Sequence, residues 1–242
     1  PSGTPFRIGY LTSIADGDAP EGYDSMKIRW LGHSSFLIEA SSGTKIITDP
    51  FEAGSYDGAV GYAPIQDSAD IVTVSHDHAD HNAVDQILGD PEVVRGGETI
   101  ESHGVAISSL STFHDESRGQ DRGRNTIHVM DVDGVRVGHL GDLGHVLSDS
   151  EAEELGGVDV LLAPVGGYYT IGPEEARDVA EKLGARIVIP MHYKTEDIGF
   201  PIQPVDDFLK LMEDVEQVGS TDVEITKETL PETRKVFVLD YK

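Results

Sequence analysis

Residues 71–81 read Ile-Val-Thr-Val-Ser-His-Asp-His-Ala-Asp-His, an apolar β-branched run followed by three histidines and two aspartates. The run 71–74 predicts a buried strand, because short β-branched segments favour strands. The cluster 76–81 then lies in the loop after this strand, ahead of a helix expected over residues 83–88. This loop decides the interpretation of the whole chain.

The side chains of the loop are of the types that bind metals. Imidazole and carboxylate suit Zn²⁺, and also Mn²⁺ or Fe²⁺. His76 and His78 stand two residues apart, so an extended loop can point both inward, while Asp80 and His81 can turn towards a second ion. The alternative is a solvated polar loop that caps the next helix.

Composition narrows the class of protein. The 242 residues include 38% hydrophobic and 26% charged residues, which is typical of a globular chain and excludes collagen and coiled coil. Cysteine is absent, so disulfides, thiolate metal sites and cysteine nucleophiles are excluded. No run approaches the ~20 apolar residues that span a bilayer, and no signal peptide is recognisable. We therefore expect a cytoplasmic protein without a membrane partner.

The charge balance is strongly acidic. Eighteen basic and 44 acidic residues give a net charge of −26. Binding to nucleic acid is disfavoured, because phosphate neutralisation needs lysine and arginine. So large a bias over the whole chain suggests a halophile with a salty cytoplasm, and an ordinary acidic protein is the alternative.

Short strands alternate with loops and a few helices. We expect one domain over residues 26–242, preceded at 1–25 by an N-terminal extension or a remnant of protein production. An integral edge strand, with a strand at 6–11, is the alternative for this segment. Asp133-Gly134 predicts a hairpin turn. The other expected strands are 27–31, 35–40, 45–48, 105–109, 126–132, 135–140, 158–163, 186–190, 222–226 and 235–239, and the other helices are 149–155, 173–183 and 205–215.

The pattern His-x-His-x-Asp-His after an apolar strand resembles the signature of the metallo-β-lactamase superfamily. Further motifs resemble its subgroup of uncharacterised metal-dependent hydrolases related to ascorbate-6-phosphate lactonase. They are Gly-His-Ser-Ser-Phe-Leu-Ile-Glu (32–39), Thr-Asp-Pro-Phe (48–51), Gly-Asp-Leu-Gly-His (141–145), Ala-Pro-Val-Gly-Gly (163–167) and Ile-Pro-Met-His-Tyr (189–193). The resemblance implies an α+β fold, an αββα sandwich of two mixed β-sheets packed face to face with helices on the outer faces.

The same resemblance implies a set of metal ligands. His76, His78 and His114 correspond to ligands of one ion, and Asp80, His81 and His192 to ligands of a second. Asp142 corresponds to the carboxylate that bridges both ions. The alternatives are a surface loop residue for His114, a turn former for Asp142 and a buried structural histidine for His192.

The implied enzyme is a binuclear metal hydrolase with two divalent ions, Zn²⁺ first and Mn²⁺ or Fe²⁺ as alternatives. A hydroxide shared by the ions would attack a small ester, lactone, amide or phosphodiester. Other readings are a nuclease of the superfamily, an iron-dependent oxygenase and a metal-binding protein without activity. Diiron oxygen-reducing relatives carry glutamate at the position of His78, so histidine here favours hydrolysis. The expected partner is a small-molecule substrate, and self-association into a homo-oligomer is left open.

Other residues are candidates for supporting roles. Asp49 matches an aspartate that supports a ligand histidine, with a turn before Pro50 as the alternative. His33 and His145 lie in matched motifs, where each could bind substrate, deliver a proton or serve structure alone. Three arginines and a tyrosine could contact substrate: Arg118, Arg122, Arg124 and Tyr168. The arginines could instead pair with Asp115, Glu116 and Asp121, and the tyrosine could pack at the surface or in the core.

Overall fold

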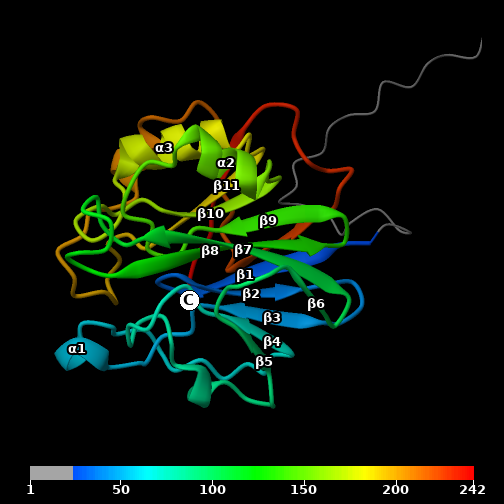
Figure 1. The fold of residues 1–242 in the computed structure, drawn as a ribbon, viewed down its shortest axis with the longest axis horizontal. Helices are drawn as coiled ribbons and strands as arrows, with labels where there is room; N and C mark the ends of the chain where they lie inside the picture. The colour runs from blue at the N-terminus through cyan, green and yellow to red at the C-terminus, as the bar shows by residue number, and fades with distance from the viewer. Residues whose placement is uncertain (1–23) are drawn as a thin grey trace, which may run out of the picture.

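Two β-sheets packed face to face form the molecule, which a computed structural model describes over residues 24–242 (Figure 1). The strand expected at 6–11, and nearly all of the segment expected to be an extension, lie outside the described residues. The six-stranded sheet has the order β13-β1-β2-β3-β4-β5, and the eight-stranded sheet has the order β12-β14-β11-β10-β9-β8-β7-β6. The α+β sandwich expected from the sequence is confirmed.

The first sheet contains β1 (Met26–Gly32), β2 (Ser35–Glu39), β3 (Lys45–Thr48), β4 (Ile71–Thr73), β5 (Glu92–Val94) and β13 (Asp222–Ile225). The second contains β6 (Ile100–Ser102), β7 (Val105–Phe113), β8 (Arg124–Val132), β9 (Val135–His139), β10 (Val160–Pro164), β11 (Ile187–Met191), β12 (Val215–Gln217) and β14 (Lys235–Val238). The helical segments are α1 (Ser55–Gly58), the 3-10 turn η2 (Val84–Gln86), α2 (Asp149–Leu155), α3 (Pro173–Lys182) and α4 (Asp206–Leu209).

The middle strands of the first sheet, β2, β3 and β4, are buried on both faces. Ile28, Phe36 and Ile38 join the core between the sheets, whereas Leu37 and Ile47 join a smaller apolar cluster on the other face. Successive residues of a strand point to opposite faces, so continuous apolar runs such as 46–47 serve both clusters. Loops complete the second cluster, and the 3-10 turn η2 contributes the partly buried Val84.

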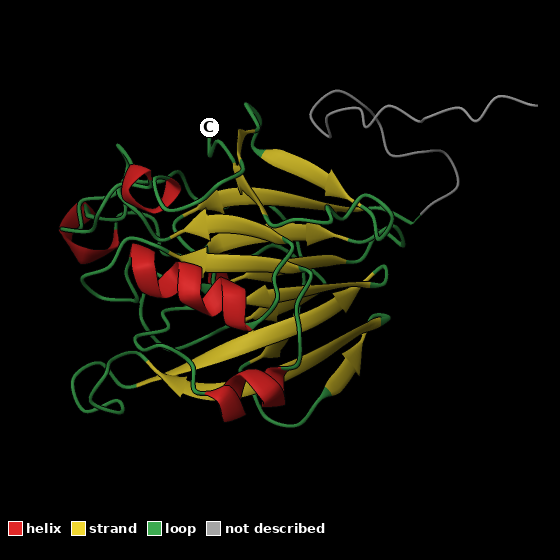
Figure 2. Cartoon of the chain, turned by 90° about the horizontal axis from the view of Figure 1, so that it is seen from above, coloured by secondary structure: helices red, strands yellow, loops and turns green. Residues whose placement is uncertain are grey.

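Helices α2, α3 and α4 cover the outer face of the second sheet (Figure 2). The central parallel strands β10 and β11 are buried along their whole length, as expected for strands covered on both faces. Helix α2 begins at Ser148, whose hydroxyl accepts from the backbone N–H of Glu151 in a capping box. Pro173 opens α3, where its missing N–H costs nothing.

Two expected helices are wrong. Residues 83–88 form only η2, because the N–H groups of Ala83 and Leu88 donate to the Pro50 and Asp67 carbonyls instead of to helical partners. Of residues 205–215 only α4 is helical, and the chain then forms β12, which pairs in parallel with β14. Strands β5, β6 and β12 were not expected, because three-residue segments carry too little periodicity.

The predicted hairpin is confirmed. Asp133 and Gly134 have φ of 49° and 75°, and Val132 pairs with Val135. Two consecutive positive φ values match the twist of the flanking strands.

Strand direction brings the predicted ligands to one edge. In the first sheet β1, β3 and β4 run in the same direction, since only β2 between them is antiparallel. In the second sheet β7, β9, β10 and β11 likewise share one direction, with β8 reversed. The loops that follow these strands gather on the side where α1 lies, at the left of Figure 1. Among the described residues no helix is both long and apolar enough to cross a membrane.

Close backbone contact locks the loops at this edge. A Cβ atom on Gly166 would lie 2.2 Å from the carbonyl oxygen of His192, and one on Gly144 would lie 2.3 Å from the Asp115 nitrogen. Both contacts are with backbone atoms, so neither neighbour can rotate away. The glycines of the 141–145 and 163–167 motifs therefore set how closely these segments approach the loops that carry the predicted ligands His114 and His192.

We expect Gly166→Ala to lower the free energy of unfolding by about 3 kcal/mol, because the methyl group forces the backbone at His192 to shift. Urea denaturation measures this. Gly157→Ala is the matched control, since Gly157 is exposed and its Cβ would meet only the Leu183 carbonyl at 3.5 Å. Equal stability of the two variants would contradict the close-contact argument.

Candidate metal centre

Three histidines form a first group at this edge. His76 and His78 follow β4, and His114 follows β7. One ring nitrogen from each lies within 4.8 Å of the other two, a spacing that suits a single ion. His76 Nε2 and His78 Nδ1 are 2.9 Å apart. The structure therefore brings together residues that are 38 positions apart in the sequence.

A second group lies beside the first and is buried. His33, Asp80, His81 and His192 each offer one atom within 4.8 Å of the others. His33 Nε2 is 3.0 Å from Asp80 Oδ2, and the His33 and His192 rings are 4.3 Å apart. His33 comes from the turn between β1 and β2, so both sheets contribute to this group. The structure places His33 inside the group, where it is 1% exposed.

Asp142 lies between the two groups. Its Oδ2 is 3.2 Å from His114 Nε2 and 3.9 Å from His76 Nε2, which belong to the first group. It is also 3.3 Å from His81 Nε2 and 3.4 Å from His192 Nε2, which belong to the second. One buried carboxylate oxygen thus faces four imidazole nitrogens.

Asp49 orients a histidine in each group. Its Oδ2 accepts hydrogen bonds from His81 Nδ1 at 2.9 Å and from the Ser75 hydroxyl at 2.6 Å. Because Ser75 gives its only hydroxyl proton to Asp49, its oxygen accepts from His76 Nδ1, 2.9 Å away. With Nδ1 engaged in this way, the Nε2 atoms of His76 and His81 are the ones that face the centre, the orientation that carboxylate partners impose on metal-binding histidines.

Burial and neighbouring charges lower the pKa values of His33, His76 and Asp142. Burial, followed by the nearby His192, lowers the pKa of His33 to about 4. Burial, followed by the nearby His81, lowers the pKa of His76 to about 3. Burial alone would raise the pKa of Asp142, but His192 and His81 hold it well below its usual range. His81 is the exception: burial lowers its pKa, and the adjacent Asp142 and Asp80 outweigh that effect and raise it.

The donor set fits divalent cations. His81 Nε2 and Asp142 Oδ1 are buried and have no hydrogen-bond partner among residues 24–242. Polar atoms in such positions are costly unless another group satisfies them. Neutral imidazoles with ionised carboxylates are the forms that bind Zn²⁺, Mn²⁺ and Fe²⁺. A metal ion at each group would satisfy both orphaned atoms.

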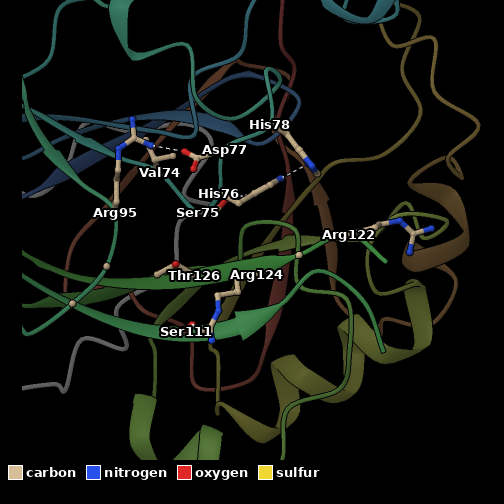
Figure 3. Close-up of a pocket in the computed structure, with 13 residues that line it drawn as sticks. Val74, Ser75, His76, Asp77, His78, Arg95, Ser111, Arg122, Arg124 and Thr126 are labelled. Atoms are coloured by element: carbon tan, nitrogen blue, oxygen red, sulfur yellow. Dashed lines mark hydrogen bonds and ion pairs between the residues drawn. The ribbon is translucent and has the colours of Figure 1, made fainter. Parts of the chain in front are cut away.

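The other residues predicted to contact substrate lie outside both histidine groups. His145 Nδ1 is 3.1 Å from the Val146 carbonyl oxygen, its ring contacts Phe113, and it belongs to neither group. Tyr168 is 65% exposed and contacts Tyr169. Arg122 and Arg124 line a cavity beside His76 and His78 (Figure 3), and Arg118 does not.

The loop of these arginines is braced, but not by the ion pairs considered from the sequence. The Asp115 carboxylate accepts hydrogen bonds from the backbone N–H groups of Gly119, Asp121 and Arg122 at 2.7–3.1 Å. The guanidinium groups are not needed for this brace. The alternative in which arginine side chains pair with Asp115 is therefore wrong, because backbone N–H groups donate to that carboxylate instead.

Two residues near the site were missed by sequence reasoning. The Tyr56 hydroxyl donates to Asp80 Oδ1 at 3.2 Å, and its ring packs edge-on against Phe200. Phe200 in turn contacts the ring of His33. Gly54 and Gly58 flank Tyr56 with φ of 82° and 86°, and no pattern in the sequence links residues 56 and 200 to the candidate metal ligands.

We expect Asp49→Asn to weaken metal binding about 10–100-fold, because an amide has one acceptor oxygen where the carboxylate uses two. Oδ1 of Asp49 accepts the Ser75 N–H, and Oδ2 accepts the Ser75 hydroxyl and His81. Competition with a coloured chelator measures the affinity. Asp70→Asn is the matched control, since Asp70 accepts the backbone N–H of Lys45 at the far end of β4. Unchanged affinity in Asp49→Asn would exclude the orienting role.

Comparison with known proteins agrees with this geometry. The family model described as "Beta-lactamase superfamily domain" matches residues 27–192. A UPF0173 metal-dependent hydrolase of Thermococcus kodakarensis is 34% identical over 222 residues, covering 80% of this chain and 95% of the relative. One of Methanoculleus marisnigri is 36% identical over 214 residues, covering 78% and 89%.

A solved structure is similar over most of its length. A Thermotoga maritima protein, named as a Zn-dependent hydrolase of the metallo-β-lactamase superfamily, has a TM-score of 0.74 and 43% identity, covering 88% of this chain and 98% of that one. Family model, relatives and fold agree on a metal-dependent hydrolase. The chain belongs to the metallo-β-lactamase superfamily and, within it, to the UPF0173 family of metal-dependent hydrolases.

Proposed function

We propose that this metal-dependent hydrolase is binuclear and that Asp142 serves both ions. The position of Asp142 Oδ2, 3.2 Å from His114 in the first group and 3.3 Å from His81 in the second, carries the proposal. His76, His78 and His114 hold one ion, and Asp80, His81 and His192 hold the other. Their nitrogen and oxygen donors favour Zn²⁺, with Mn²⁺ and Fe²⁺ as alternatives.

The proposed substrate is a small ester, lactone, amide or phosphodiester. Divalent ions in this site would lower the pKa of water from 15.7 towards about 7 and so supply hydroxide at neutral pH. Asp80 and Asp142 are then engaged as ligands, which leaves neither free as a general base. His33, buried and 3.0 Å from Asp80, acts by positioning that carboxylate. His145 and Tyr168, further from the ligand groups, are left as candidates for contact with the leaving group or the substrate.

Other reaction classes are less well supported. A net charge of −26 opposes a nuclease, because a polyanionic substrate would be repelled. An iron-dependent oxygenase remains the competing redox proposal, since the same donors bind Fe²⁺. Metal analysis of the purified protein together with a panel of hydrolysable substrates separates these classes.

Metal content tests the binuclear proposal. We expect about two ions per chain, and we expect their removal by a chelator to abolish hydrolysis and lower Tm, because bound metal stabilises the folded state. Asp142→Ala should lose both ions, whereas His192→Ala should keep one. Elemental analysis of the two variants measures this. Equal loss of both ions in His192→Ala, or one ion in the wild type, would contradict the proposal.

We also propose that the acidic composition is an adaptation to high salt, and that the chain is related to the ascorbate-6-phosphate lactonase subgroup. Self-repulsion among 26 excess negative charges weakens as salt screens it. Tm should therefore rise from 0.1 to 2 M KCl. A flat Tm over this range would favour an ordinary acidic protein.

A further inference from the structure

A cavity of about 550 Å³ opens beside the first histidine group, and His76 and His78 form part of its wall. Arg95, Arg122 and Arg124 line it too (Figure 3). The chain has only ten arginines, so three of them are concentrated where this cavity meets the metal ligands. In a protein of net charge −26, such a local excess of positive charge needs a reason.

Arg95 is held in place from the loop that carries His76 and His78. Its Nη1 donates to Asp77 at 3.0 Å and its Nη2 donates to Asn82 at 2.7 Å. A guanidinium has five N–H donors, so three remain for a ligand. Sequence reasoning missed Arg95, because it follows the short strand β5 and lies 27 residues before Arg122.

Arg124 lies on the other side of the cavity. It donates to the Ser111 hydroxyl at 3.2 Å, and Figure 3 shows both side chains across from Arg95. Arg122 turns outward, with its guanidinium 5.6 Å from the centre of the Tyr169 ring. Among residues 24–242 neither Arg122 nor Arg124 has a carboxylate within 4.0 Å in an ion pair. Of the described residues that line the cavity, only Asp77 carries a carboxylate.

Glycines keep the cavity open between the arginines. Gly97 and Gly123 have φ of 114° and 90°, and a Cβ atom on either would meet no heavy atom within 4 Å. Backbone therefore borders the cavity next to Arg95 and Arg124, and the polar side chains of Ser111 and Thr126 line it as well. Guanidinium and hydroxyl groups around an open space suit a compact oxyanion.

We propose that this cavity binds a carboxylate or phosphate group of the substrate, held by Arg95 and Arg124 beside the scissile bond. The inference rests on the proposed hydrolytic function and adds the class of substrate. It replaces the substrate contacts considered for Arg118, Arg122 and Arg124 with a pair drawn from the loop after β5 and the start of β8. Arg122, at the rim, guides the anion in.

A different role for Arg95 makes different predictions. If it only braces the loop of His76 and His78 through Asp77, its loss should lower kcat and metal content alike for every substrate. If it binds the anionic group, its loss should raise KM for an anionic ester alone.

The test uses the metal-loaded protein, a neutral ester (4-nitrophenyl butyrate) and a matched anionic ester (mono-4-nitrophenyl succinate). Arg95→Ala and Arg124→Ala should each raise KM for the anionic ester about tenfold or more, the effect of losing a charge-assisted hydrogen bond. KM for the neutral ester and metal content should stay unchanged. Arg177→Ala is the control, because Arg177 is an exposed α3 residue paired with Asp178.

Calorimetric titration with inorganic phosphate provides a second readout that does not depend on hydrolysis. We expect Kd to rise about tenfold in Arg95→Ala and Arg124→Ala and to be unchanged in Arg177→Ala. Phosphate bound by metal ions alone would bind wild type and variants equally, which would overturn the proposal, as would a wild type that does not bind phosphate. If neither ester is hydrolysed but the phosphate result holds, the anion site stands and the proposed reaction fails.

Discussion

The burial of three carboxylates constrains how the rest of this structure is arranged. Asp49, Asp80 and Asp142 are each at most 6% exposed, and an ionised carboxylate loses its hydration when it is buried. Asp49 accepts hydrogen bonds from His81 and Ser75, and Asp80 accepts one from Tyr56 and lies 3.0 Å from His33. Asp142 instead faces four histidine nitrogens, which a bound cation would share with it. Compensation on this scale requires that loops from both sheets meet at one edge. The candidate metal centre therefore forms only when the two sheets pack as they do, and the packing in turn fixes where its side chains meet.

The ligand loops accept backbone strain to meet this requirement. His33, Asp49 and His192 have φ of 51°, 38° and 50°, in the left-handed region that costs non-glycine residues energy. The strain is held by hydrogen bonds to backbone, since the His33 carbonyl accepts from both the Trp30 indole and the His192 N–H. Candidate ligands on such over-determined loops are pre-organised and present a fixed geometry.

Local patterns in the sequence determined much of this architecture. The apolar run 71–74 and the cluster after it located the centre of the site, and the β-branched runs located most strands. The hairpin at Asp133-Gly134 followed from the two positive φ values that it needs. These features depend on interactions between residues close in sequence, and such interactions can be read from the chain directly. The family motifs extended them to the residues that the structure gathers around Asp142.

Contacts between distant residues were decided by the tertiary structure alone. Segments 83–88 and 205–215 have helical composition, yet hydrogen bonds to Pro50 and Asp67, and pairing with β14, outweigh that preference. Arg95 reaches the cavity of Arg124 because β5 lies beside β4, and no local pattern records that neighbourhood. The sequence alone determined the fold class and the clustering of histidine and aspartate side chains that suit a metal ion. Which cationic and aromatic groups border the ligands depends on how the loops of two sheets meet, since that is set by long-range packing.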